Sequence, residues 1–344
     1  MDIKIKVKPE DFIVQESQSF FISLSEKNMN YLILSLGKKG YTTFEAVSLI
    51  ADFFNINQSL VGYAGLKDED GITYQFISIP IGIPIVHRIQ EFNQQYENNN
   101  RFISIIVMGY SEDKIRVGKL QGNAFRIRLR NVPKDIAEYM HMENRRRVVF
   151  PNYYDTQRFG VPNMPKRTHW IGEALYNERY DLAMKYMKEG TPKEAADLND
   201  ISDSKSYFRS MDRSKLSFYY NAFTSYRYNS YLKRRIKEKV QCVDKYYDGI
   251  VFVMPKNGNH LICLSDSLEK ICIPRYEIDN NMELRLKYYY RYSYIDTIIH
   301  TKSVEEDMMF HGMCSVNIEF FLPSGCYATM AIKQFLCNLE YQAE

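Results

Sequence analysis

The stretch from Gly65 to Gln75 contains residues whose types and spacing could do chemistry. Lys67 and Asp68 fall between an expected strand at 61–64 and another that begins near Ile72, so Asp68 is expected on a connecting loop, where catalytic groups are often held. A carboxylate beside a cation is kept ionised, which a nucleophile requires. An ordinary turn, in which Asp68 bonds its own backbone, explains the same residues and is the better interpretation on the residues alone.

Residues 123–130 show a second pattern, in which apolar and basic side chains alternate. The alternation predicts a strand with Phe125, Ile127 and Leu129 on one face and three arginines on the other. The shared parity makes Phe125 a candidate for the core, although a ring near the end of a strand can also face a ligand.

These residues belong to a set of five short stretches that follow one another in a fixed order. The set resembles the motifs of the TruD family of RNA pseudouridine synthases. Each match is short, but the five span nearly the whole chain, from near residue 6 to near residue 329, whereas the region from about 163 to 300 matches poorly. The stretches are Lys6–Phe12 (KVKPEDF), Gly65–Gln75 (GLKDEDGITYQ), Leu120–Ile127 (LQGNAFRI), Pro151–Gly160 (PNYYDTQRFG) and Phe321–Thr329 (FLPSGCYAT).

The resemblance implies an α+β fold in which a pseudouridine synthase-type catalytic domain, built on a central mixed or antiparallel sheet, receives an inserted second lobe. The catalytic domain is expected at 1–150 plus 302–344, and the TruD-type insertion domain at 151–301. The implied activity is the isomerisation of a uridine in tRNA to pseudouridine, at position 13 in bacterial members of the family. The implied partner is RNA, no metal or organic cofactor is needed, and a cytoplasmic monomer is expected.

The resemblance also implies roles for individual residues. In the family, an Asp at the position of Asp68 is the essential catalytic residue, which takes part in detaching the uracil from its sugar. Phe12, Phe125 and Tyr327 would line the uracil site, into which the target base must be extruded from the folded RNA. Asn123 would read the edge of the base, because an amide both donates and accepts hydrogen bonds.

Supporting roles follow for further polar residues. Lys6 could pair with the catalytic carboxylate or with a phosphate, with Lys8 as a neighbouring competitor, and both could instead lie on a solvated strand face. Lys67 is a further supporting candidate beside Asp68. Gln157 and Arg158 would contact the RNA backbone or brace their loop.

The sequence departs from the family pattern at two places. Tyr154 and Asp155 replace a Phe-Gly pair, which puts a negative charge beside Gln157 and Arg158. Gly71 replaces the usual Ala and is expected to loosen the chain just after the loop of Asp68. Asp11, within the first motif, is expected to anchor a turn rather than to act as a second catalytic acid.

Hydrophobic periodicity predicts both strands and helices without strict strand–helix alternation, which favours the α+β class. A capping box is expected at Thr42 and Glu45, followed by a helix. Residues 190–215 are polar and are expected to form a loop. The expected strands are 2–8, 31–36, 72–79, 101–108, 123–130, 249–254 and 316–322, and further helices are expected at 170–189, at 213–239 and after Tyr327.

The charge of the chain is nearly balanced, with 45 Lys and Arg against 42 Asp and Glu among 344 residues. The segment 114–167 carries 13 Lys and Arg but only 4 Asp and Glu, and aromatic residues are interleaved with them. This pattern fits a surface that tracks RNA phosphates and stacks on bases. A solvated face with scattered salt bridges explains it equally well.

Other classes of protein find little support in the sequence. The N-terminus lacks the apolar region of a secretory signal, and no segment has the length of a membrane span. The six Cys all lie in the last third without a C-x-x-C pair, and the six His lack metal-ligand spacing. An intracellular, soluble protein with reduced thiols and no metal site is expected.

Three alternatives remain open on the sequence. The chain could be a catalytically silent RNA-binding protein on the same fold, in which case Asp68 would be dispensable. It could perform the same chemistry on another RNA. It could also be an unrelated α+β protein, although five ordered matches argue against chance.

Overall fold

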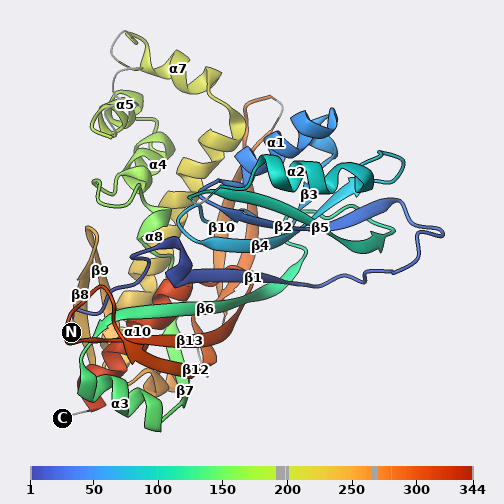
Figure 1. The fold of residues 1–344 in the computed structure, drawn as a ribbon. Coiled ribbons are helices and arrows are strands. Elements are labelled where there is room, and N and C mark those ends of the chain that lie inside the picture. Colours follow the sequence, from blue (N-terminus) through green and yellow to red (C-terminus); the bar gives the residue numbers. More distant parts are fainter. Residues whose placement is uncertain are drawn as a thin grey trace. The chain divides into compact units, whose positions relative to one another are not determined.

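The computed structural model describes residues 2–98, 100–190, 198, 201–264, 270–279 and 281–342 (Figure 1). It consists of two compact units. The first comprises Met1–Arg147 and Thr297–Gly325, and the second comprises Val148–Asp296 and Cys326–Glu344. These units are defined by their internal contacts, which do not identify one of them as an insertion. The division into a catalytic domain and an insertion domain therefore stays a prediction.

A large mixed sheet organises the first unit, although residues 148–151 of its last strand in the order below belong to the second. Its strand order is β5-β2-β4-β1-β6-β13-β12-β7, and β3 pairs with β4. β1 and β4 run parallel, whereas β1 and β6, β6 and β13, and β2 with both β4 and β5 are antiparallel. The α+β class and the central mixed sheet are therefore confirmed. The strands are β1 (Phe12–Gln18), β2 (Tyr31–Lys39), β3 (Gly62–Tyr63), β4 (Ile72–Pro80), β5 (Phe102–Ser111), β6 (Leu120–Val132), β7 (Arg145–Pro151), β12 (Tyr294–Glu306) and β13 (Cys314–Pro323).

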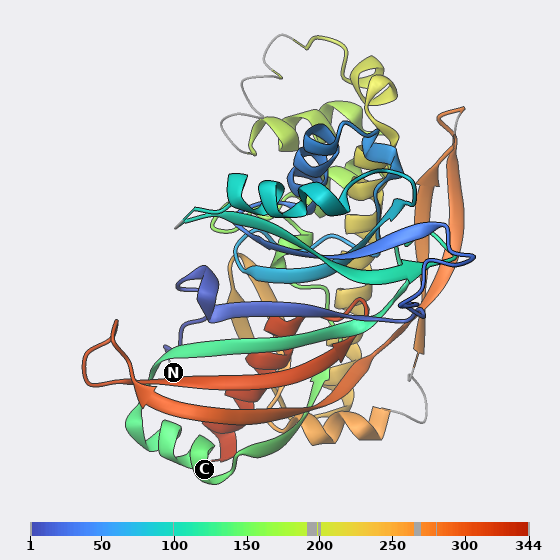
Figure 2. The same cartoon turned by 45° about the vertical axis from the view of Figure 1, so that its right-hand side comes forward.

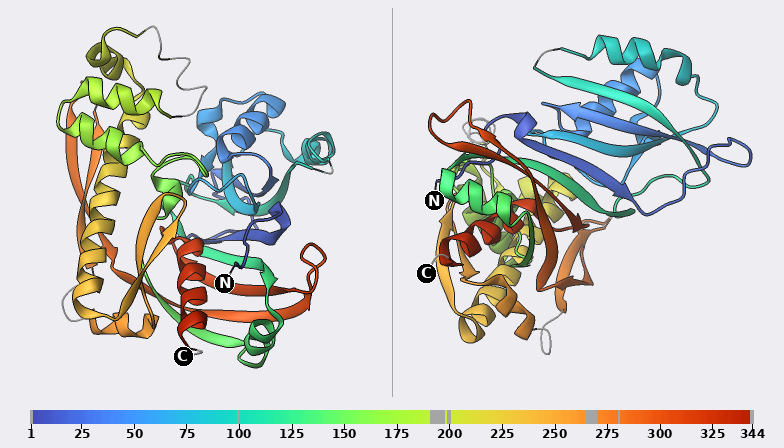
Figure 3. Two further views of the ribbon diagram at one scale, coloured as in Figure 1. Left: turned by 90° about the vertical axis from the view of Figure 1, so that its left-hand side faces the viewer. Right: turned by 60° about the horizontal axis from the view of Figure 1, so that its bottom comes forward.

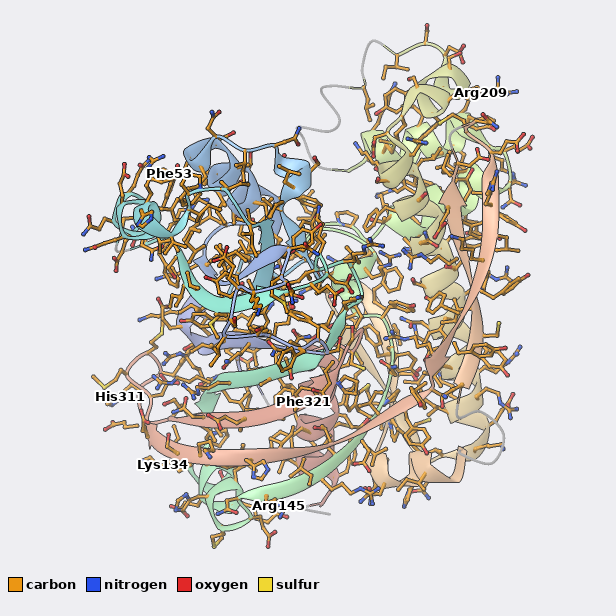
Figure 4. The ribbon with its side chains drawn as sticks, turned by 90° about the vertical axis from the view of Figure 1, so that its right-hand side faces the viewer. Phe53, Lys134, Arg145, Arg209, His311 and Phe321 are labelled. Atoms are coloured by element: carbon orange, nitrogen blue, oxygen red, sulfur yellow. The ribbon has the colours of Figure 1, made fainter. Side chains whose placement is uncertain are left out.

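Two helices cover one face of the sheet formed by β2, β4 and β5, as Figure 2 shows. The expected capping box begins α1 (Thr43–Phe54), because the side chain of Thr42 accepts from the Glu45 amide and the Glu45 carboxylate accepts from the Thr42 amide. The ring of Phe53 lies 5.2 Å from that of Phe92 in α2 (Ile89–Gln95) (Figure 4). A third helix of this unit, α3, spans Lys134–Met142.

The N-terminal segment differs from the expected strand. Residues 2–8 form only a single bridge, between Lys4 and Arg130. Lys6 has a left-handed backbone, with φ at 55°, and the short 3-10 helix η1 (Pro9–Asp11) follows. Proline removes a ladder donor, so the strand β1 begins only at Phe12.

The second unit combines helices with two hairpins, β8–β9 and β10–β11. The expected helix at 170–189 is interrupted near Glu178, whose φ is 55°. Part of the expected loop at 190–215 is helical, while residues 191–197, 199 and 200 lie outside the described residues. The elements, seen from two further sides in Figure 3, are α4 (Thr168–Tyr176), α5 (Tyr180–Lys188), α7 (Ser204–Ser210), α8 (Arg213–Lys239), β8 (Cys242–Tyr247), β9 (Ile250–Pro255), β10 (Lys270–Ile278), β11 (Leu284–Tyr292) and α10 (Ala328–Gln342).

Candidate functional site

The loop 65–71 joins β3 to β4 and carries Asp68, whose side chain is 41% exposed. Hydrogen bonds tie this loop to the start of α1 and to β4. The Lys67 amide donates to Thr43 Oγ1 at 2.9 Å, and Gln75 Nε2 donates to the Gly65 carbonyl at 3.2 Å. Thr43 Oγ1 in turn donates to Gln75 Oε1 at 3.0 Å. The loop therefore presents an accessible carboxylate on a constrained backbone.

Lys6 is the cation that the structure places at Asp68. Its Nζ lies 2.8 Å from Asp68 Oδ2, although the two residues are 62 positions apart in sequence. The same ammonium lies 4.2 Å from the ring centroid of Phe12. An ammonium at this distance favours the ionised carboxylate over the neutral acid. Of the two roles open to Lys6, pairing with the carboxylate of Asp68 is the one observed.

The adjacent Lys67 has a different partner. Its Nζ lies 2.6 Å from Glu16 Oε2, and both side chains are almost wholly buried. Burial raises the pKa of the Glu16 carboxyl, and the charge of Lys67 opposes this effect. Lys67 therefore holds the loop against β1. Lys8 is exposed, and its amide donates to Asp11 Oδ2 at 2.9 Å, so Asp11 anchors a turn as expected.

A cluster of three phenylalanines, Phe12, Phe125 and Phe320, lies beside the Lys6–Asp68 pair. The Phe12 and Phe125 rings meet edge to face at 6.1 Å, and Phe125 stacks on Phe320 of β13 at 5.3 Å. Phe12 and Phe125 are both more than nine-tenths buried, so their first role is in the core. Aromatic pairs of this geometry fix ring orientation.

Asn123 lies opposite Glu16 in the pairing of β1 with β6. Its Oδ1 atom is buried and has no hydrogen-bond partner among the described residues. A buried amide oxygen in this state costs free energy unless a partner arrives. The atom is therefore a candidate acceptor for a polar group of a ligand.

Lys38 is a part of this site that the sequence reasoning missed. Its side chain is fully buried, and its ammonium donates to the carbonyl groups of Tyr41, Lys67 and Asp68. The sequence did contain a signal that Lys38 is buried, because it lies on the same face of the strand as three buried leucines at alternate positions. Those leucines are Leu32, Leu34 and Leu36.

The expectation that Gly71 loosens the chain is wrong. Gly71 is buried, and a Cβ atom added there would lie 2.5 Å from the Phe12 carbonyl oxygen. A Cβ atom does not approach a carbonyl oxygen that closely in real proteins. Because glycine has no Cβ atom, the loop can pass close to the start of β1 at Gly71. Gly71 thus reflects tight packing at the base of the loop that carries Asp68.

The remaining candidates, Tyr327, Gln157 and Arg158, belong to the second unit. The Tyr327 ring lies 6.2 Å from that of Tyr154, and burial raises the pKa of Tyr327 to about 12. Arg158 Nε donates to Ser225 Oγ at 3.2 Å, which braces the loop. Gln157 is exposed.

Asp155 does not point its charge at Arg158. Its carboxylate caps the following turn through the Thr156 amide, forms an ion pair with Lys333 Nζ at 2.5 Å, and accepts from the Thr329 hydroxyl. Its φ is −81°, so no left-handed backbone is required where the family has Gly. Residues of α10 thus pair with the additional negative charge of Asp155 inside the second unit.

The basic segment 114–167 is partly neutralised by acids from elsewhere in the chain. Arg130, expected on an exposed face of β6, is buried instead and pairs with Asp11 and Asp307. The reason is a bulge where β6 meets the start of β13, which shifts the alternation. Other pairs are Arg126 with Glu319, Arg128 with Glu305, Lys166 with Asp248 and Arg167 with Glu189.

Among the described residues, no group of three His, Cys, Asp or Glu is gathered closely enough to hold a metal ion. The same part of the chain contains no helix that is both long and apolar enough to cross a membrane.

Comparison with known proteins decides the family. The family model described as tRNA pseudouridine synthase D (TruD) matches residues 1–204, which is more than half of the chain. The chain belongs to the TruD family. Four of the five motif stretches begin and end within the matched range, whereas the stretch that contains Tyr327 lies beyond it.

Individual TruD-family relatives agree with the match. A protein of Pyrococcus furiosus, named a probable tRNA pseudouridine synthase D, is 30% identical over 288 residues, covering 74% of this chain and 67% of its own length. A probable tRNA pseudouridine synthase D of Nanoarchaeum equitans is 24% identical and covers 96% of this chain and 98% of its own. A crystal structure from Methanosarcina mazei, assigned as TruD, shares the fold with a TM-score of 0.61 at 19% identity, over 96% of this chain and 93% of the other.

Proposed function

We propose that this protein isomerises a uridine in tRNA to pseudouridine, at position 13 as in bacterial members of the family. Membership of the TruD family supports the reaction class. The observation that carries the assignment of the site is the ion pair between Lys6 and the exposed Asp68, on a loop whose backbone is fixed from several sides. RNA is the partner, and the enzyme works as a cytoplasmic monomer.

The reaction rearranges bonds without oxidation or reduction. The bond from the sugar C1′ to N1 of uracil breaks, and a bond from C1′ to C5 forms. The proton that leaves C5 is balanced by the one that N1 gains. In this proposal Asp68 is the catalytic residue at the glycosidic bond, and Lys6 keeps its carboxylate ionised and oriented.

Recognition of the base involves a small set of residues. The uridine is extruded from the folded RNA, because its reacting atoms are not reachable inside a helix. The Oδ1 of Asn123, which has no partner among the described residues, accepts from the base edge, and Phe12 and Phe125 line the uracil site on the first unit. Lys67 supports the loop that carries Asp68, and Gln157 and Arg158 support their own loop in the second unit.

The first prediction tests Asp68 with a matched control in the same loop. Asp68→Asn and Asp68→Ala should each lower pseudouridine formation about a thousand-fold or more, because they remove the reacting carboxylate. Asp70→Ala, which removes a more exposed carboxylate from the same loop, should leave it near the wild-type rate. Unmodified tRNA transcripts are incubated with each protein, and pseudouridine is mapped to single nucleotides.

Binding measurements separate this function from its alternatives. The Asp68 variants should bind tRNA within about threefold of wild type, since a lost carboxylate does not remove phosphate contacts. Wild-type turnover in Asp68→Ala would refute the assignment of the catalytic residue. Binding without pseudouridine on any tRNA would point to another RNA substrate or to a silent RNA-binding protein.

A further inference from the structure

Lys38 occupies an unusual place for a charged side chain. It lies near the end of β2 with no exposed surface. The strand is held on both sides, because Lys38 stands opposite Thr73 of β4 and Ile103 of β5. A buried ammonium is strongly unfavourable unless hydrogen bonds replace the lost water, so the acceptors around it explain why it is tolerated.

The acceptors are three backbone carbonyl groups. Lys38 Nζ donates to the oxygen of Tyr41 at 2.8 Å, of Lys67 at 3.2 Å and of Asp68 at 2.7 Å. An ammonium has three donors, so each has an acceptor. Two of the three carbonyls belong to the loop 65–71, at Asp68 and the residue before it.

We propose that Lys38 is a positioning residue, whose protonated ammonium fixes the backbone of Lys67 and Asp68 so that the Asp68 carboxylate meets Lys6. The proposal rests on the proposed function, in which Asp68 is the catalytic residue. Lys38 contacts the loop only through main-chain oxygens, so it acts on the geometry of the carboxylate and not on the substrate.

Protonation of Lys38 is essential to this role. A neutral amine has two donors and a lone pair, so it would satisfy at most two of the three carbonyls and turn its lone pair toward the third. The loop would then lose a hydrogen bond together with the attraction between the charge and the carbonyl dipoles. Loss of the proton should therefore loosen the backbone at residues 67 and 68.

The surroundings of Lys38 bring its pKa into the pH range in which turnover can be measured. The pKa of Lys38 is lowered to about 8, chiefly by burial and also by the charge of Lys67. The carboxylates of Asp68, Glu69 and Glu45 oppose the shift. Turnover is therefore expected to fall as the pH rises through about 8.

Folding stability should follow the opposite course. Because the pKa of Lys38 is lower in the folded chain than its ordinary 10.5, the unfolded chain binds more protons between about pH 8 and 10.5. In that window the contribution of Lys38 to stability rises with pH. Loss of turnover without loss of stability is the signature of a positioning role.

Two substitutions test the proposal. Lys38→Met keeps the length of the side chain but removes its donors, and should lower the single-turnover rate at saturating tRNA about a hundredfold, with RNA affinity nearly unchanged. Lys38→Arg keeps a charge at all pH values used, so it should recover part of the rate and move the alkaline fall to higher pH. Lys27→Met is the control, because Lys27 is an exposed lysine of the same unit that lies outside the basic segment 114–167.

Two results would overturn the proposal. One is a wild-type rate in folded Lys38→Met. The other is an alkaline fall at the same pH in wild type and Lys38→Arg, which would assign that fall to the RNA or to another group. If Lys38→Met does not fold, the comparison of wild type with Lys38→Arg decides.

Hydrogen exchange tests the same inference without any turnover. Peptides that cover residues 64–72 should exchange about tenfold faster in Lys38→Met than in wild type, while peptides from α1 should be unchanged. Equal exchange in the loop would overturn the role of Lys38 even if the enzyme were active. A protein with faster loop exchange but no activity on any tRNA would instead contradict the proposed function.

Discussion

Gly65 and Gly71 stand at the two ends of the loop that carries Asp68, and the space around them differs. A Cβ atom at Gly71 would meet the Phe12 carbonyl oxygen at 2.5 Å. A Cβ atom at Gly65 would find only the end of the Lys67 side chain, at 3.9 Å. Only Gly65 has room for the methyl group of alanine. Alanine, the usual residue of the family motif at position 71, would therefore clash with the start of β1 in this chain.

The second prediction uses this contrast. Gly71→Ala should lower the free energy of unfolding by about 1–3 kcal/mol, because the added carbon must push β1 and the loop apart. Turnover should fall as well, since Phe12 lies under the Lys6 ammonium. Gly65→Ala is the matched control and should change neither. Urea unfolding and single-turnover kinetics check both variants, and equal behaviour of the two would contradict the steric argument.

At the scale of elements, the start of α10 is fixed by a residue far away in sequence. Asp155 is almost fully buried, and it contacts Thr329 and Lys333, 174 and 178 residues further along. The Lys333 ammonium also lies 4.6 Å from the ring centroid of Tyr247. The helix begins directly after Tyr327, so both residues that Asp155 holds lie in its first two turns.

The third prediction concerns this pair. Asp155→Asn should destabilise the protein by about 3 kcal/mol, because it removes the carboxylate that pairs with the Lys333 ammonium in a largely buried place. The double variant Asp155→Asn with Lys333→Met should recover most of the loss. Urea unfolding of wild type, both single variants and the double variant gives the coupling energy. Additive losses would show that the two residues act independently.

At the scale of the whole chain, Arg130 joins segments that are distant in sequence. Its guanidinium contacts Asp11 at 2.7 Å and Asp307 at 3.1 Å, so it connects the first motif, β6 and the turn between β12 and β13. Burial raises the pKa of Asp307, but donors from Asn131, Met309 and Arg130 outweigh it and hold the pKa below its ordinary value of 3.8.

The fourth prediction follows from the sign of this shift. The ionised Asp307 stabilises the folded chain fully above about pH 4, and the stabilisation is lost as the pH falls through the lowered folded value. Asp307→Asn should cost about 1–3 kcal/mol at pH 7 and should flatten the acid limb of the stability profile. Asp113→Asn, in an exposed pair with Lys119, should leave that limb unchanged. An acid limb that is steep in both variants would refute the argument.

The sequence by itself determined the features that depend on local pattern. The strand at residues 123–130, the capping box of Thr42 and Glu45, and the order of the five motifs predicted structure or family correctly, although the alternation failed at Arg130. Local patterns succeed there because period and capping depend on residues a few positions apart. They failed for residues 2–8, where the left-handed Lys6 and the turn at Pro9 break an alternating pattern.

Only the tertiary structure decided which side chains meet. Lys67 is adjacent to Asp68 in sequence but pairs with Glu16, and the partner of Asp68 is Lys6. Neighbouring side chains leave the backbone in different directions, so contact depends on how distant strands are brought together. The same reason hid the role of Lys38, since its three acceptors are carbonyl groups, which carry no signature in the sequence.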